Sequence, residues 1–173
     1  MLALAGLSLP APLLAKGLAA CGSERQLSFL NTHTGETLTC VTYWANGTYF
    51  GESLAQIDHV LRDHRTGEIT NIDLFLLDQL SLLNQALEND RPFHVISGYR
   101  SPETNRSLRL NGTGGVVKGS FHTKGRAIDL RIPGLELKYL RMAAISMHQG
   151  GVGYYPDSQF VHLDTGVART WRG

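Results

Sequence analysis

Two segments of the chain place hydrophobic residues at the spacing of an α-helix. The first is short and carries Leu54, Ile57, Val60 and Leu61. The second is longer, and its apolar stripe consists of Leu74, Leu77, Leu80, Leu83 and Leu87. Asn71 has the side chain of an N-cap residue, and the turn-forming run at residues 89–92 is expected to end this second helix.

Two further helices are expected in the second half of the chain. Ser101 followed by Pro102 is typical of a helix start, because serine caps the helix and proline fits its first position. Another helix is predicted near Leu135–Met147. Between these two helices, residues 112–119 are rich in glycine and are expected to form a loop.

Short runs of alternating or β-branched residues predict the strands. They are Leu27–Asn31, Thr37–Tyr43, Phe93–Ser97, Arg126–Ile132 and Phe160–Asp164. The first two runs flank Gly35, which indicates a hairpin, and Asn46-Gly47 marks another turn. Strands and helices follow one another without a regular βαβ rhythm, so the pattern predicts an α+β fold.

Composition agrees with one folded domain and argues against several classes of protein. The chain has 173 residues, of which 42% are hydrophobic and 18% charged, so it can fill a core. A net charge of +1 argues against a nucleic-acid-binding protein and against a polybasic membrane binder. The chain has two cysteines and no CxxC pair, which excludes a four-thiolate zinc site. We expect residues 22–173 to form a single domain and the protein to be a monomer.

The first 21 residues differ from the rest of the chain. Their apolar run is too short to span a bilayer comfortably, but it fits the core of a secretory signal. We therefore expect residues 1–21 to be an export signal or a lipoprotein-type leader, and the protein to be exported to the periplasm or cell envelope. A buried N-terminal helix is the alternative. The run ends at Cys21 in a segment that resembles both a lipobox and an ordinary cleavage site; a disulfide to Cys40 is possible unless Cys21 is lipidated.

Polar side chains on one face of the last two predicted strands carry the candidate chemistry. Strand alternation sets Asp129 opposite its apolar neighbours, and it sets His162 and Asp164 together on one face. His122 comes seven residues before Asp129, and Gly125 between them permits a tight turn. Two histidines and one carboxylate form a three-ligand set that leaves a fourth position for water, as at catalytic zinc sites. Separate surface groups without a shared role are the alternative.

A known signature covers the same residues. The segment Ser120–Asp129, which reads SFHTKGRAID, matches the SxHxxGxAxD signature of the LAS-type zinc peptidases. That group includes D-Ala-D-Ala carboxypeptidases, VanX-like dipeptidases and the hedgehog signalling fold. Segments 27–36, 61–68, 150–156 and 160–166 resemble its YcbK-like branch, the murein endopeptidase K type, so the resemblance covers about residues 27–171.

The resemblance implies a fold, a metal and a substrate. The fold would be hedgehog/DD-peptidase-like, with a small antiparallel sheet that carries the metal site and helices that flank it. One zinc ion would be held by His122, Asp129 and His162. The substrate would be the peptides of bacterial peptidoglycan, cut at cross-links or in stem peptides, so the resemblance implies a zinc-dependent murein endopeptidase or carboxypeptidase.

The position at which several relatives carry the general base has a different residue in this chain. Several relatives have Glu or Asp three residues before the last histidine, where this chain has Gln159, which cannot take a proton from water. Asp164 is the first candidate base, because it shares a strand face with His162. Its alternative role is to orient a metal ligand. Asp157 is the second candidate.

Residues 97–102 are the other family-like segment. Arg100 stands before a predicted helix start, where backbone N–H groups favour anions, and the resemblance implies that it binds a substrate carboxylate or the developing oxyanion. An arginine that bridges loops is the alternative. Tyr99 and Ser120 are expected to line the same cleft. The remaining histidines are expected to be structural or exposed; they are His33, His59, His64, His94 and His148.

Two other functions remain open. One is a catalytically inactive zinc-containing module that binds the cell wall, since the hedgehog fold keeps such a site outside the peptidases and Gln159 replaces a carboxylate. The other is a lipid-anchored structural protein without a metal, which would require the His/Asp spacing to be accidental.

Overall fold

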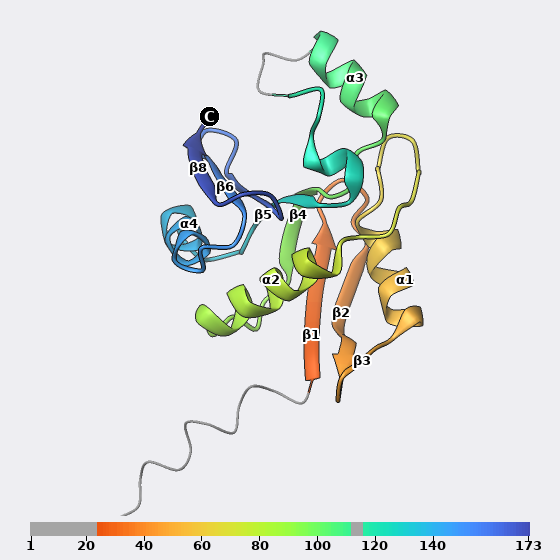
Figure 1. The fold of residues 1–173 in the computed structure, drawn as a ribbon, viewed down its shortest axis with the longest axis vertical. Helices are drawn as coiled ribbons and strands as arrows, with labels where there is room; N and C mark the ends of the chain where they lie inside the picture. The colour runs from red at the N-terminus through yellow and green to blue at the C-terminus, as the bar shows by residue number, and fades with distance from the viewer. Residues whose placement is uncertain (1–23, 112–115) are drawn as a thin grey trace, which may run out of the picture.

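The structure, a computed structural model, describes residues 24–111 and 116–173. The strands in these residues are β1 (Glu24–Asn31), β2 (Thr37–Ala45), β3 (Thr48–Tyr49), β4 (Phe93–Ser97), β5 (Ala127–Arg131), β6 (Gly151–Tyr155), β7 (Phe160–Asp164) and β8 (Arg169–Arg172). The helices are α1 (Gly51–Val60), α2 (Leu74–Ala86), α3 (Pro102–Asn111), the 3-10 helix η1 (Phe121–Lys124) and α4 (Leu137–Ser146). Figure 1 shows α3 set apart from the other three α-helices.

The described strands form one eight-stranded sheet in the order β3-β2-β1-β4-β5-β7-β6-β8. The predicted α+β class is confirmed, but the predicted small antiparallel sheet is wrong. The sheet is larger and mixed, because β1 pairs with β4 in parallel and β6 pairs with β8 in parallel. The prediction omitted β6, whose glycines are poor strand formers, and the four-residue edge strand β8.

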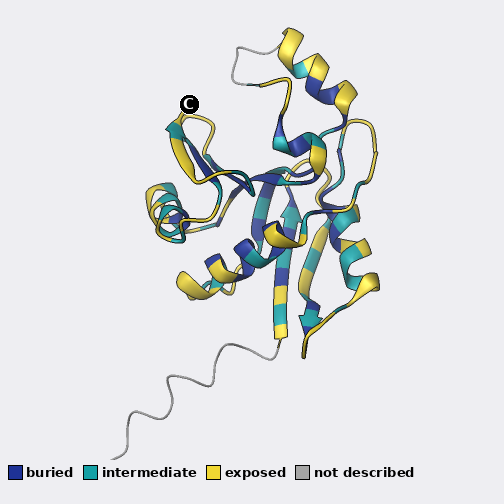
Figure 2. Cartoon of the chain, in the orientation of Figure 1, coloured by how far each residue is buried: buried dark blue, intermediate teal, exposed yellow. Residues whose placement is uncertain are grey.

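Three helices cover the core side of this sheet. Helix α1 packs against β1 and β2, α2 packs against β1, and α4 packs against β6 and β7. Strand residues that alternate toward these helices are fully or almost fully buried (Figure 2); they include Leu27, Phe29, Phe93, Val95, Ile128, Leu130, Val161 and Leu163. The side chains between them point to the opposite face, and in β5 and β7 these include Asp129 and His162.

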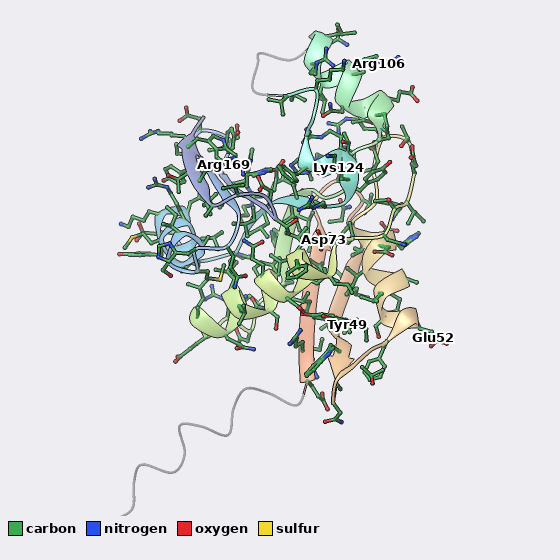
Figure 3. The ribbon with its side chains drawn as sticks, viewed as in Figure 1. Tyr49, Glu52, Asp73, Arg106, Lys124 and Arg169 are labelled. Carbon is green, nitrogen blue, oxygen red and sulfur yellow. The ribbon has the colours of Figure 1, made fainter. Side chains whose placement is uncertain are left out.

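N-cap residues were predicted for two of the helices, α3 and α2. The Oγ of Ser101 accepts a hydrogen bond from the backbone N–H of Thr104 at the start of α3, as predicted. The cap of α2 is Asp73, labelled in Figure 3, rather than Asn71. Its carboxylate accepts a hydrogen bond from the N–H of Phe75. Asp73 also accepts hydrogen bonds from the side chains of Arg126, just before β5, and Thr165, just after β7, a tertiary role that local sequence does not reveal.

The predicted leader, including Cys21, lies outside the described residues, as does part of the predicted glycine-rich loop at 112–115. Within residues 24–111 and 116–173, no helix is long and apolar enough to cross a membrane.

Candidate metal centre

The candidate ligands come from a short helical turn and from two paired strands. Asp129 of β5 and His162 of β7 are direct partners in the antiparallel register of the two strands. His122 lies in η1, which Ser120 caps and Gly125 ends in a left-handed conformation with φ 64°. A Cβ at position 125 would lie 2.5 Å from the carbonyl oxygen of Asn71, so glycine permits the turn that leads into β5.

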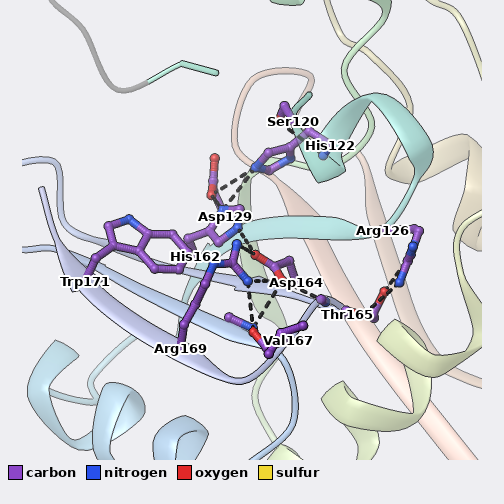
Figure 4. Close-up of polar contacts among 12 residues, drawn as sticks. Ser120, His122, Arg126, Asp129, His162, Asp164, Thr165, Val167, Arg169 and Trp171 are labelled. Carbon is purple, nitrogen blue, oxygen red and sulfur yellow. Dashed lines mark hydrogen bonds and ion pairs between the residues drawn. The ribbon is translucent and has the colours of Figure 1, made fainter. Parts of the chain in front are cut away.

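Three ligand atoms converge on one point (Figure 4). Nδ1 of His162 lies 2.8 Å from Oδ1 of Asp129, and Nε2 of His122 lies 3.2 Å from the same oxygen. The two ring nitrogens are 3.2 Å apart. Bonds of about 2.0–2.1 Å to a tetrahedral ion would place ligand atoms about 3.3 Å apart, so the spacing fits a metal such as zinc.

Outer contacts of the two histidines select the nitrogen that faces this point. Nδ1 of His122 lies 2.7 Å from the carbonyl oxygen of Gly98, which accepts a hydrogen bond and therefore requires a proton on Nδ1. Nε2 of His162 lies 3.1 Å from Oδ2 of Asp164, which in the same way favours a proton on Nε2. The other nitrogen of each ring faces Asp129 and is the one that a metal ion would use.

Asp129 and His162 stabilise each other's charged forms. Burial alone would raise the pKa of Asp129, but the neighbouring imidazoles of His122 and His162 hold it well below its usual range. Burial alone would lower the pKa of His162, yet its hydrogen bonds with Asp129 and Asp164 raise it to about 9. Because a pKa of about 9 leaves His162 protonated at neutral pH when no metal is bound, a metal ion must displace this proton before Nδ1 can bind it.

Asp164 lies behind His162, on the far side of the ring from Asp129 and His122. It has no exposed surface. Its Oδ1 accepts hydrogen bonds from the backbone N–H groups of Gly151 and Gly166, and Arg169 contacts both of its oxygens. Burial opposes ionisation, but the hydrogen bonds from His162 and Arg169 hold the pKa of Asp164 well below its usual range.

Arg100 lies beside the ligands, with its Nη2 3.5 Å from Oδ2 of Asp129 and 3.3 Å from Oγ of Ser97. Its side chain is 11% exposed. The buried Nε of Arg100 has no hydrogen-bond partner among the described residues.

A cleft of about 730 Å³ opens over the site. Its lining includes the candidate ligands, Arg100, Ser120, Phe121, Tyr155, Asp157, Phe160, Asp164, Arg169 and Trp171. Tyr99 was expected in the cleft but is not part of its lining, since its hydroxyl donates to Oε1 of Glu68. Gln159 is exposed and turns its amide back to the carbonyl of Pro156. The β6–β7 turn thus brings Asp157, and not Gln159, into the cleft.

Three groups at the candidate metal site were not predicted from the sequence. They are the carbonyl of Gly98 and the side chains of Arg169 and Trp171. A backbone carbonyl has no sequence signal. The alternation of Arg169 and Trp171 in β8 is a strand signal, but four residues near the chain end are too few to establish a strand without its partner.

Of the remaining histidines, two lie away from the ligands as a stacked pair. The rings of His33 and His64 are 3.8 Å apart, and Nε2 of His33 contacts the carbonyl oxygen of Ile96. His59 lies 3.4 Å from Glu36. Among the described residues, only His122, Asp129 and His162 form a cluster that could hold a metal ion.

An α+β fold with a His–Asp–His cluster on adjoining elements, together with family comparison, places the chain among the M15 metallopeptidases of the LAS type. The family model described as peptidoglycan L,D-endopeptidase MepK matches residues 19–171, and the chain belongs to this family. The family resemblance found in the sequence is confirmed.

Named relatives cover almost the whole chain. It is 46% identical to the peptidoglycan L,D-endopeptidase MepK of Escherichia coli (strain K12). The alignment runs over 174 residues and covers 99% of this chain and 94% of the relative. It is 40% identical over 177 residues to the probable peptidoglycan L,D-endopeptidase MepK of Haemophilus influenzae (strain Rd), with the same coverage. The comparison with solved structures gave no match.

Proposed function

We propose that this protein is a zinc-dependent peptidase that cleaves peptide bonds in bacterial peptidoglycan. The observation that carries the proposal is the convergence of His122, Asp129 and His162, whose ligand atoms lie 2.8–3.2 Å from one another. Because the relatives are named L,D-endopeptidases, we assign the same specificity to this chain.

Zinc is the metal we assign to the site. Two imidazole nitrogens and one carboxylate oxygen, with a position left open to the cleft, suit catalytic zinc. When bound, zinc polarises a scissile carbonyl and lowers the pKa of water to about 7. The chain's own contribution is to orient the two imidazoles before the metal arrives, His122 through Gly98 and His162 through Asp164.

We assign Asp164 to the orientation of His162 rather than to proton transfer. It contacts Nε2 of His162, whereas Nδ1 faces the other ligands. Its two oxygens already meet three side-chain and two backbone N–H donors, against about four lone-pair sites on a carboxylate. A carboxylate so occupied, with a strongly lowered pKa, is a poor acceptor for a further proton.

We assign the general base to Asp157. It is exposed in the β6–β7 turn and lines the cleft, so water can reach its carboxylate. We assign Arg100 to a substrate carboxylate or to the developing oxyanion, since it lines the cleft and its guanidinium lies beside Asp129. Ser120 lines the cleft, but its Oγ accepts from the N–H of His122, so we assign it to shaping the site.

We further propose that residues 22–173 act as a single, monomeric peptidase domain in the periplasm or cell envelope, after export directed by residues 1–21. Either cleavage before Cys21 with lipidation or ordinary signal removal is compatible with this proposal. Lipidation would anchor the domain to a membrane and leave Cys40, which is exposed on β2, without Cys21 as a partner.

Mass spectrometry of purified muropeptides after incubation with zinc-loaded protein tests the activity. Loss of L,D-cross-linked species and appearance of their monomers is expected, and the same incubation with His122→Ala is the control. If the wild-type protein binds zinc but leaves every cross-link intact while it still binds peptidoglycan, the inactive binding module, which Gln159 keeps open, replaces the peptidase.

A further inference from the structure

Strand β8 carries an arginine that reaches across its neighbour to the metal site. β8 pairs with β6, and β6 pairs with β7. Their register aligns Arg169, Gly151 and Asp164 in one row across the three strands. Nη2 of Arg169 lies 2.7 Å from Oδ2 of Asp164, and Nη1 lies 3.0 Å from Oδ1 (Figure 4). The guanidinium therefore holds both oxygens of a fully buried carboxylate.

Gly151 leaves the room for this ion pair. A Cβ at this position would lie 2.4 Å from Nη1 of Arg169 and 2.6 Å from Oδ2 of Asp164. Both separations are far shorter than a carbon atom tolerates, so any side chain at 151 must displace the arginine, the carboxylate or both. The glycine that weakens β6 as a strand signal is thus what lets Arg169 cross it.

A second row, formed by Trp171, Gly153 and His162, repeats the arrangement along the same strands. A Cβ at Gly153 would lie 2.7 Å from ring carbons of Trp171. The indole lies with its centroid 5.2 Å from that of the His162 imidazole, and its N–H donates to the hydroxyl of Tyr155 over 2.9 Å. Trp171 therefore packs beside His162 in a fixed position.

The guanidinium of Arg169 also lies near two aromatic rings. Its central carbon is 5.6 Å from the ring centroid of Phe121 and 4.9 Å from that of Trp171. Phe121 directly precedes the ligand His122, and Trp171 packs beside the ligand His162. Although the Arg169 side chain is 44% exposed, these contacts favour the orientation in which it pairs with Asp164.

We propose that Arg169 is a positioning residue of the metal site, which fixes Asp164 and through it the orientation and tautomer of His162. The inference rests on the proposed metal site, and it makes strand β8 a part of that site although β8 supplies no ligand. Without Arg169, Asp164 keeps its backbone contacts at Oδ1 but loses the donor that aligns Oδ2 with the imidazole. The alternative is that Arg169 only neutralises a buried charge.

Zinc affinity of the full chain, measured by competition with a chromophoric chelator, separates the two roles. Arg169→Gln and Gly151→Ala are both expected to weaken zinc binding roughly tenfold, the lower end of the effect of outer contacts on a metal ligand. Arg172→Gln is the matched control. Arg172 lies on the same strand, is exposed and packs over Tyr154, and its variant should bind zinc like the wild type.

NMR of protein labelled at histidine supplies a readout that a purely structural role would not change. The Nε2–H signal of His162 should shift and exchange faster in Arg169→Gln, and Arg169→Lys, which keeps the charge but not the two-point contact, should restore it in part. Thermal unfolding of each variant reports whether it is folded. A lower melting temperature with unchanged zinc affinity and an unchanged His162 signal would overturn the inference. A wild-type protein that binds no zinc would reject the metal site itself.

Discussion

Asp129 and His162 are direct partners in the register of β5 and β7, and Oδ1 of the carboxylate lies 2.8 Å from Nδ1 of the imidazole. Two of the three candidate ligands are therefore held by a backbone hydrogen-bond ladder and not by loops. A site supported in this way is ordered before a metal binds, because the strands themselves fix both Cα positions.

Removal of one imidazole should abolish metal binding. The wild-type protein, purified without chelator, is expected to hold about one zinc ion per chain and His122→Ala close to none, since two remaining donors bind zinc weakly. Elemental analysis measures both. His148→Asn is a suitable control because His148 is exposed and has a left-handed backbone that asparagine tolerates. Equal zinc in His122→Ala and the wild type would remove His122 from the ligand set.

Asp164→Asn should lower the affinity of the site for zinc. The substitution keeps the size of the side chain but weakens the acceptor for the Nε2–H of His162 and unpairs Arg169. Zinc affinity is expected to fall by roughly 10–100-fold. Chelator competition measures it. Normal zinc binding with a loss of turnover would instead return Asp164 to the role of general base.

Asp157→Asn should lower the rate of hydrolysis without affecting zinc binding. Hydrolysis of a cross-linked muropeptide is expected to slow by roughly 10²–10⁴-fold, the usual contribution of a general base, while zinc content stays near that of the wild type. Gln159→Glu installs the carboxylate that other relatives use and is the companion variant. Full activity of Asp157→Asn would exclude Asp157 as the base.

Arg100→Gln should lower kcat/KM on the order of 10²–10³-fold, because the variant loses the charged donor to the substrate carboxylate or oxyanion. Steady-state kinetics with a muropeptide separates the two partners: a rise in KM indicates the ground-state carboxylate, and a fall in kcat indicates the oxyanion. Arg106→Gln, on the exposed side of α3, is the control. Unchanged kinetics for Arg100→Gln would leave Arg100 as a bridge between loops.

Acid should weaken the fold through Asp63, which is 1% exposed. Burial alone would raise its pKa, but hydrogen bonds from Thr104 and from the N–H groups of Arg65 and Ser101 lower it to about 2. Because the folded pKa lies below the usual 3.8, the contribution of this carboxylate to stability is complete above about pH 4 and is lost as the pH falls toward 2.

Asp63→Asn should therefore lower the free energy of unfolding by about 2 kcal/mol at neutral pH and by little near pH 2. Urea unfolding across this pH range measures the difference, with the exposed Asp90→Asn as control. A pH-independent difference would show that shape, and not ionisation, makes Asp63 stabilising.

The predicted leader is tested by N-terminal mass analysis of protein from its native cells. Chains that begin near residue 21 are expected, and a diacylglyceryl group on Cys21 would identify a lipoprotein. An intact Met1 on protein in the cytoplasm would contradict export.

Local sequence determined much of the fold and most of the candidate site. Leucine spacing predicted α2, and strand alternation put His162 and Asp164 on one face, because these periodicities follow from helix and strand geometry alone. The motif around His122 and Asp129 needs few distant contacts, since a capped turn and one strand present both side chains.

The tertiary structure decided the chemical role of Asp164, which strand alternation left open. Whether Asp164 takes a proton or orients a ring depends on Arg169 and Gly151, which reach it only when β6, β7 and β8 assemble. The sheet is wider than predicted for the same reason. The local sequences of β6 and β8 do not predict strands, and hydrogen bonds with neighbouring strands stabilise them in the sheet. Alternation assigns a side chain to a face, whereas its chemical role depends on the groups that other strands bring to it.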